Sequence, residues 1–269
     1  MHPVIFQLGS FSFPAYGLLV AAGYLAAIFY IFRKAAAAGL KKDDVSDVVF
    51  YSVLSGMAGA KLFYAVTYWR EFGAGLAERL AYLLTNFRYG FVFYGGLLGG
   101  LAGFFLSARK KLKDWRRAAD VFAPAVALGH AFGRIGCFLA GCCHGSPTSC
   151  ALGVTFTDPA SEVAPAYLGV PLHPTQLYEA AGNLVIFAFL NAALGRALKG
   201  RLPAGTVPGL YALLYSAQRF GLEFLRGDDR GAFLLGLSPA QLFSCAIFCA
   251  AAVYIGILKR NYEKKQDRL

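Results

Sequence analysis

Long apolar segments recur along the chain, separated by short polar connections. Each is close to the roughly 20 residues that an α-helix needs to cross the hydrocarbon core of a bilayer. The pattern predicts an all-α integral membrane protein with seven transmembrane helices in one polytopic domain, residues 1–269. The predicted spans are 14–32, 46–69, 91–108, 118–141, 176–195, 205–225 and 237–258.

The composition excludes an ordinary soluble protein. Hydrophobic residues make up 57% of the chain and charged residues 15%, whereas about a quarter of the residues in a soluble domain are charged. No polar stretch reaches the roughly 100 residues of a typical extramembrane domain. The first apolar segment has no basic residue before it, so we interpret it as a retained span, not a signal peptide.

The basic residues predict the orientation in the membrane. The net charge is +11, and most Lys and Arg lie in clusters between alternate spans, at 33–42, 109–117, 196–201 and 259–268. The segment before Pro14 and the stretch 142–173 contain none. Because cytoplasmic loops carry the excess of Lys and Arg, we expect the N-terminus outside and the C-terminus in the cytoplasm. Topology and anionic headgroups explain the positive charge, so no nucleic-acid partner is expected.

A few charged residues lie inside the predicted spans. Arg134 lies in the segment GHAFGRIG, while Arg219, Glu223 and Arg226 are four and three residues apart and are predicted to share a helix face with Tyr215. A charge at the bilayer centre costs at least about 2.5 kcal/mol, so it needs a partner, a cavity or a polar ligand. These residues form either a mutually satisfied ion network or an anion site. The planar guanidinium matches phosphate oxygens, and a further arginine on another span favours the anion site.

Five ordered motifs carry a resemblance to one family over nearly the whole chain. They are HPVIFQLGSFSFPAYGLL, FYGGLLGG, GRIGCFLAGCCHG, HPTQLYEA and LYSAQRFGLEFLRGDD. Together they resemble the prolipoprotein diacylglyceryl transferases of bacterial inner membranes. The resemblance implies a multi-pass enzyme of the cytoplasmic membrane. Such an enzyme moves the diacylglyceryl group of phosphatidylglycerol to the lipobox cysteine thiol of a secreted preprolipoprotein and releases glycerol phosphate. Its implied partners are that lipid, that protein and the bilayer, with no cofactor and no metal.

The resemblance also implies roles for residues at the motif positions. Arg134 and Arg219 are expected to hold the lipid phosphate, Glu223 to orient Arg219, and Arg226 to support the site entrance. Tyr94 occupies a position expected to be catalytic. The other implied substrate-binding residues are Tyr16, Gly95, Gly96, Cys137, Gly145, His173, Gln176, Glu179 and Tyr215.

The chain departs from the family pattern at Tyr94, where the family usually has a histidine that is a candidate base for the substrate thiol. A phenol with an ordinary pKa of about 10 is a poor base at neutral pH. A thiol near pKa 8.5 needs only modest help, which a cationic pocket supplies in part. Loss of the histidine therefore slows the reaction without forbidding it. His130, one helical turn before Arg134, and His144 are the alternative bases, whereas His173 is expected to orient the following helix.

The second departure is Cys137, at a position that is asparagine in the family. It begins a cluster completed by Cys142, Cys143, His144 and Cys150. Soft ligands grouped in this way could bind Zn or Cu. Alternatively, Cys142 or Cys143 could form a redox disulfide with Cys150. Buried thiols also serve as small packing groups. The spacing is not a paired CxxC pattern, and adjacent cysteines do not easily reach one tetrahedral centre. The sequence therefore predicts no metal site.

Two other functions remain open on the same residues. One is a divergent lipid-dependent transferase that uses another acceptor, or that uses Cys142 or Cys143 as a covalent relay. The other is a non-catalytic membrane redox protein that uses the thiols of Cys137, Cys142, Cys143 and Cys150. A channel or transporter is disfavoured, because the chain lacks the repeated, interrupted helices typical of a substrate path.

Overall fold

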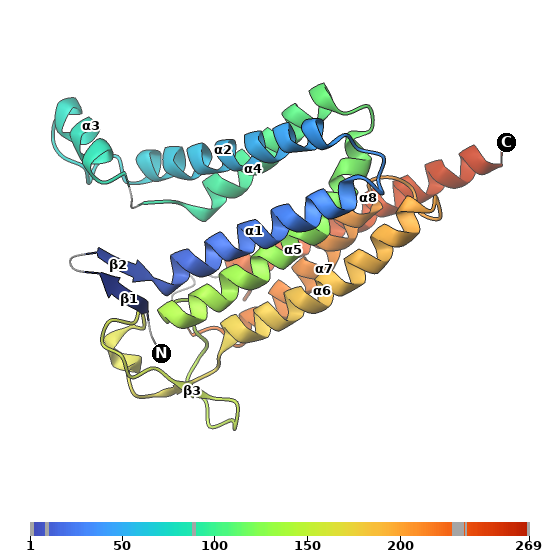
Figure 1. The fold of residues 1–269 in the computed structure, drawn as a ribbon. Helices are drawn as coiled ribbons and strands as arrows, with labels where there is room; N and C mark the ends of the chain where they lie inside the picture. Colours follow the sequence, from blue (N-terminus) through green and yellow to red (C-terminus); the bar gives the residue numbers. More distant parts are fainter. Residues whose placement is uncertain (1–2, 9–10, 88–89, 228–233, 235, 268–269) are drawn as a thin grey trace. The chain divides into compact units, whose positions relative to one another are not determined.

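The computed structural model describes residues 3–8, 11–87, 90–227, 234 and 236–267 of the protein. These residues are mainly helical and divide into two compact units (Figure 1). The first unit comprises residues 1–34 and 119–269, and the second comprises residues 35–118. The prediction of one domain over residues 1–269 remains a prediction.

The first unit is built from five long helices, two of which extend a few residues past its boundaries. These are α1 (Ala15–Ala35), α5 (Trp115–Ala140), α6 (Thr175–Leu198), α7 (Thr206–Glu223) and α8 (Pro239–Gln266). Helices α1 and α5 approach closely because Gly23 faces Gly129, with no side chain on either. Between α7 and α8, the Tyr254 hydroxyl donates to the carbonyl oxygen of Gly205 at 3.1 Å.

The second unit packs α2 (Lys42–Thr67) against α4 (Phe93–Lys111), with the short helix α3 (Leu76–Thr85) between them in the chain. Glycines make the close approach possible. A Cβ atom on Gly95 would collide with the carbonyl oxygen of Gly59, and one on Gly99 would collide with that of Ser55. Small residues at a contact let two membrane helices approach closely. Packing therefore accounts for Gly95 and Gly99, as expected from their spacing.

Seven long helices of the described residues coincide with the seven predicted spans to within about four residues, except that α8 continues eight residues past the predicted end at 258. Within the described part of the chain, five of them, α1, α2, α5, α6 and α8, are long and apolar enough to cross a membrane. Helices α4 and α7, which carry glycines and charged residues, are not among these five. The helical fold class is confirmed, whereas seven crossings and the sidedness of the termini remain predictions.

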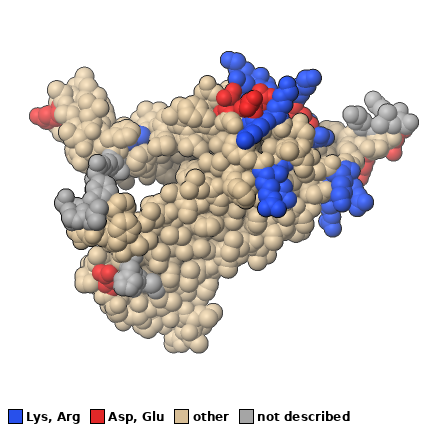
Figure 2. Space-filling model, in the orientation of Figure 1, with Lys and Arg blue, Asp and Glu red and all other residues tan. Residues whose placement is uncertain are grey.

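Basic residues lie at one end of the helix pair in the second unit. Arg109, Lys110 and Lys111 lie in the last turn of α4, and Lys111 pairs with Asp47 near the start of α2 at 2.6 Å. In Figure 2, blue and red atoms gather at this end of the pair. Basic residues thus meet where α2 begins and α4 ends, as the predicted antiparallel order of these spans requires.

Besides α3, three short features of the chain were not predicted from the sequence. Strands β1 (Val4–Leu8) and β2 (Phe11–Pro14) form an antiparallel hairpin before α1. Strands β3 (Val154–Thr155) and β4 (Pro171–Leu172) pair within the connection between α5 and α6, which also contains a 3₁₀ turn, Pro165–Tyr167. Phe156 and Leu172 are fully buried in a small core in this connection. The connection is therefore a folded subdomain that can position functional groups.

Asp120 ties α5 to the beginning of α7. Its carboxylate accepts hydrogen bonds from the backbone N–H groups of Gly205 and Val207 at 2.8 and 2.9 Å, and the residue is 1% exposed. Unpaired N–H groups at a helix start cost about 1–3 kcal/mol each when buried. We therefore expect Asp120→Ala to lower the free energy of unfolding by about 2–4 kcal/mol, measured by denaturant unfolding in detergent micelles.

Asp114 provides a matched control for this stability prediction. It lies just before the same helix and accepts from the backbone N–H of Arg117 at 3.2 Å, but it is exposed. Asp114→Ala should therefore change the unfolding free energy by less than about 1 kcal/mol. If Asp120→Ala unfolds at the same denaturant concentration as Asp114→Ala, the buried cap does not stabilise the fold as described.

Candidate active site

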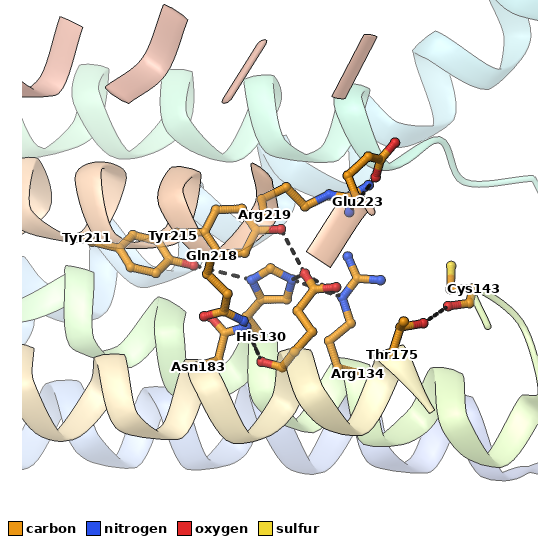
Figure 3. A network of polar contacts seen from close by, with 11 residues as sticks. His130, Arg134, Cys143, Thr175, Asn183, Tyr211, Tyr215, Gln218, Arg219 and Glu223 are labelled. Carbon is orange, nitrogen blue, oxygen red and sulfur yellow. Dashed lines mark hydrogen bonds and ion pairs between the residues drawn. The ribbon is translucent and has the colours of Figure 1, made fainter. Parts of the chain in front are cut away.

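Polar residues from three helices meet inside the first unit. Arg134 comes from α5, Glu179 from α6, and Tyr215 and Arg219 from α7. Figure 3 shows the labelled side chains of Arg134, His130 and Tyr215 turned toward one another between the helices. The structure thus brings together residues that the sequence assigned to separate motifs.

Glu179 is the centre of this network and is 1% exposed. Its Oε1 lies 3.1 Å from Nε of Arg134 and accepts a hydrogen bond from the Tyr215 hydroxyl at 2.9 Å. Within the described residues, the side-chain hydrogen bond and the ion pair of Arg134 both use Nε, and neither uses Nη1 or Nη2. Glu179 therefore neutralises and orients the guanidinium from one side and leaves its two terminal nitrogens for a ligand.

His130 is integrated into the same network. Its Nε2 accepts from Nε of Arg134 at 3.3 Å, and its Nδ1 lies 3.3 Å from the hydroxyl of Tyr211. The ring also packs against that of Tyr215, with centroids 4.9 Å apart. His130 therefore helps to hold Arg134. To accept a proton at Nε2 as a base, His130 would have to give up its hydrogen bond from Arg134.

Residues that the sequence analysis did not single out support Glu179. The side-chain amides of Asn183 and Gln218 donate to its backbone carbonyl oxygen at 2.9 and 3.0 Å. Tyr211 joins the network through the contact of its hydroxyl with Nδ1 of His130. The signal that could have found two of them is spacing, because Asn183 follows Glu179 by four residues and Tyr211 precedes Tyr215 by four. Polar residues one helical turn from a charged or polar residue lie on the same face.

Arg219 is held by a second carboxylate, as the spacing predicted. Its Nη1 lies 2.9 Å from Oε2 of Glu223, and the other oxygen of Glu223 accepts a hydrogen bond from the hydroxyl of Ser238 at 2.6 Å. Ser238 is also the N-cap of α8, where its hydroxyl accepts from the backbone N–H of Gln241. The start of α8 thus fixes Glu223, which in turn orients Arg219.

Arg226 does not share the helical face of Arg219 and Glu223, so that part of the prediction was wrong. Helix α7 ends at Glu223, and Arg226 instead forms an isolated β-bridge with Gly145. Around this bridge, the backbone N–H of Gly145 donates to His173, and that of Ser146 donates to Leu225, both at 2.9 Å. The chain leaves the helix because its backbone pairs with the connection that follows α5.

The HPTQ segment organises the outer end of the site. His173 contributes backbone hydrogen bonds to the loop, and its Nδ1 lies 3.4 Å from the hydroxyl of Tyr178, which fits the expected orienting role. Thr175 and Gln176 donate side-chain hydrogen bonds to the carbonyl oxygens of Cys143 and Cys142, at 3.0 and 2.7 Å. The first turn of α6 therefore fixes the backbone of the adjacent cysteines.

Three of the predicted cysteines lie together near Arg134. The sulfur atoms of Cys137, Cys142 and Cys143 are within 4.8 Å of one another. Hydrogen bonds from the Cys137 and Cys142 thiols, and the charge of Arg226, lower the pKa of the Cys143 thiol. All six cysteines of the chain are free thiols in the structure, so the considered disulfide to Cys150 is not formed in it.

The remaining predicted residues have different surroundings. Tyr16, on the first turn of α1, lies close enough to Arg134 and Cys137 for their charges to act on its hydroxyl group. His144 is buried, with Nδ1 2.9 Å from the carbonyl oxygen of Gly145 and its ring against Tyr167, so it is part of the packed connection.

The glycine-rich motif belongs to the second unit. There, Tyr94 is 61% exposed and its ring contacts that of Phe93, while Gly95 and Gly96 face α2. Their predicted roles in catalysis and substrate binding remain predictions.

The fold and the site define a class: a helical membrane protein with paired arginines and carboxylates inside a helix bundle. The family model for prolipoprotein diacylglyceryl transferase matches residues 3–257. The chain belongs to this family, which confirms the resemblance seen in its motifs.

Individual relatives match the chain over nearly its full length. A phosphatidylglycerol–prolipoprotein diacylglyceryl transferase of Clostridium tetani is 34% identical over 264 residues, covering 98% of both chains. A relative with the same name from Geobacter sulfurreducens is 36% identical and covers 97% of this chain and 96% of its own. One from Clostridium perfringens, named transferase 2, is 33% identical over 100% of this chain and 98% of its own.

Proposed function

We propose that the protein transfers the diacylglyceryl group of phosphatidylglycerol to the lipobox cysteine thiol of a secreted preprolipoprotein, releasing glycerol phosphate. The observation that carries this proposal is the geometry of Arg134. A buried carboxylate holds Nε of its guanidinium, while Nη1 and Nη2 take no part in that contact. The planar edge formed by these nitrogens suits the oxygens of a phosphodiester.

Arg219 supplies a second positive charge for the same phosphate. It lies on α7, four residues after Tyr215, and both Arg134 and Arg219 act electrostatically on the Tyr215 hydroxyl. A lipid phosphate that enters this site leaves water. An ionised group within a membrane needs a fixed partner of opposite charge, and the two guanidinium groups provide it. Glu179 and Glu223 keep the two guanidinium groups oriented before the lipid binds.

The proposed reaction uses these charges on the leaving group. The substrate sulfur forms a bond to the glyceryl carbon, the bond from that carbon to the phosphate oxygen breaks, and glycerol phosphate leaves with the bonding electrons. Negative charge therefore grows on the phosphate as the bond breaks. Fixed cations in a site shielded from water stabilise such charge without having to reorganise. The thiol gives up its proton to water or to the departing phosphate ester, and the positive field of the two arginines favours the thiolate form.

The location of the reaction follows from the predicted orientation. The proposed site lies where α5 ends and α6 begins, next to the connection 142–173, which has no Lys or Arg. We infer that this end faces the outside of the bacterial cytoplasmic membrane. A secreted preprolipoprotein would then reach the site from the outer face, and phosphatidylglycerol would reach it from the bilayer.

The test is mass spectrometry of a lipobox peptide after incubation with the purified protein and phosphatidylglycerol. We expect a diacylglyceryl adduct on the peptide cysteine and release of one glycerol phosphate per adduct. A peptide with serine in place of that cysteine is the control and should stay unmodified.

The Tyr94→His variant separates the transferase from its alternatives. An adduct with the native protein shows that Tyr94 is compatible with the chemistry. An adduct only with Tyr94→His would mean that the chain is a transferase scaffold repurposed at the position of the family base. No adduct with either folded protein would contradict the proposal and favour a function of the thiol cluster.

A further inference from the structure

The thiols of Cys137, Cys142 and Cys143 form a group that the proposed transferase reaction does not use. Their sulfur atoms lie within 4.8 Å of one another, and none is in a disulfide. From this geometry we propose that the three cysteines bind one Cu(I) ion as a three-coordinate thiolate site. The proposal concerns binding by these side chains and does not depend on the transferase activity.

The local backbone is strained where two adjacent cysteines reach one centre. Cys143 has a φ of 62°, in the left-handed region that residues other than glycine rarely adopt. The structure nevertheless brings the sulfur atoms of both adjacent cysteines into one group, although the sequence predicted no metal site because adjacent cysteines do not easily reach one centre and the spacing is not a CxxC pattern. The thiol cluster thus contains a residue in a strained conformation, and such residues gather at functional sites.

Neighbouring elements hold this conformation in place. Cys137 lies in the last turn of α5, and its carbonyl oxygen accepts from the backbone N–H of Gly141, whose φ is 89°. Thr175 and Gln176 fix the carbonyl oxygens of Cys143 and Cys142 from the first turn of α6. Because the backbone on both sides is fixed, the three sulfur atoms are close to one another before any ion binds.

The sulfur positions suit a small soft cation. With metal–sulfur bonds of about 2.3 Å, as for zinc thiolates, trigonal coordination places the sulfur atoms about 4.0 Å apart. The observed limit of 4.8 Å closes to this value with side-chain movements of less than about 1 Å. Thiolates select Cu(I) and Zn among biological metals. Within the described residues the group contains three ligands and no fourth, which fits three-coordinate Cu(I) better than tetrahedral Zn(II).

Cationic side chains near the thiols offset part of the negative charge of the proposed site. Binding forms three copper–sulfur bonds and releases three thiol protons, so the site carries a charge of −2 without any change of oxidation state. The guanidinium group of Arg226 contacts the Cys143 thiol, and the charge of Arg134 acts on Cys137 and Cys143. The charge of Arg226 offsets one of these negative charges, whereas the charge of Arg134 is already balanced by Glu179. A buried charge is tolerated when it is compensated in this way.

The experiment is anaerobic titration of the purified full-length protein with Cu(I) against a chromogenic Cu(I) chelator. We expect one ion per chain. X-ray absorption at the copper edge should show three sulfur neighbours at about 2.3 Å. This spectrum comes from the native chain and requires no variant. Two sulfur neighbours, nitrogen ligation, or displacement of Cu(I) by an equal free concentration of Zn(II) would each overturn the proposal.

Variants assign the ion to the cluster. The other three cysteines, Cys150, Cys245 and Cys249, are exposed and lie outside it. Their combined replacement by serine should leave one Cu(I) bound with unchanged affinity. Cys143→Ser should weaken binding at least about 100-fold, more than the loss of an outer-shell partner usually costs. If the combined variant loses the ion, or folded Cys143→Ser keeps native affinity, the cluster is not the site.

Discussion

Arg134→Ala is expected to reduce diacylglyceryl transfer by about 10³-fold or more, the largest loss of any single substitution in this chain. Removing one preorganised donor to a developing oxyanion typically costs about 10²–10³ in rate, and Arg134 offers two donors and a positive charge. The measurement is the initial rate of adduct formation on a lipobox peptide at saturating phosphatidylglycerol.

Two variants make this prediction specific. Arg134→Lys keeps the charge but loses both the planar pair of nitrogens and the Nε contact to Glu179, so it should recover only a small part of the rate. Arg196→Ala removes an exposed arginine in the last turn of α6 and should keep the native rate.

The stability of Arg134→Ala must be measured separately from its rate. The substitution leaves Glu179 buried without its cation, and breaking a buried pair costs about 3–5 kcal/mol. Rates should therefore be compared only for protein shown to be folded by circular dichroism. A folded Arg134→Ala protein with a rate within tenfold of the native rate would remove Arg134 from the proposed mechanism.

The helices could be predicted from hydropathy because each long apolar segment has one favourable environment, the bilayer. Their ends in the structure differ from the prediction by up to about four residues, except that α8 continues eight residues past its predicted end. Helix α3 and the two pairs of strands were not predicted, for a physical reason. They are short, and neighbouring segments determine their structure, as when Phe156 and Leu172 are buried together in the α5–α6 connection.

The site was predictable only where its contacts are local in sequence. The i, i+4 pair of Arg219 and Glu223 was expected and is an ion pair in the structure. The partner of Arg134 was not, because Glu179 lies on another helix and no spacing rule joins residues 45 positions apart. The same limit applies to Cys142 and Cys143, whose closeness involves a left-handed residue that the sequence does not reveal.

Glu179→Gln is expected to lower the transfer rate by about 10- to 100-fold while the protein remains folded. The amide keeps the size of the side chain and still accepts from Tyr215, but it carries no charge to orient Arg134. Hydrogen bonds to charged groups contribute about 1.5–3 kcal/mol, which corresponds to this range of rates. The reduction should appear in kcat, because Glu179 acts on the orientation of a group that binds the leaving phosphate.

A double-mutant cycle distinguishes positioning from a purely structural role. If Glu179 acts through Arg134, Glu179→Gln should have almost no further effect on the residual rate of Arg134→Ala, since the group that it orients is gone. Tyr215→Phe is the matched comparison, because it removes a hydrogen-bond donor to Oε1 without changing the charge and should cost less. Additive effects of Glu179→Gln and Arg134→Ala would show that the carboxylate contributes independently of the arginine. The buried pair would then hold the helices together and not prepare Arg134 for its ligand.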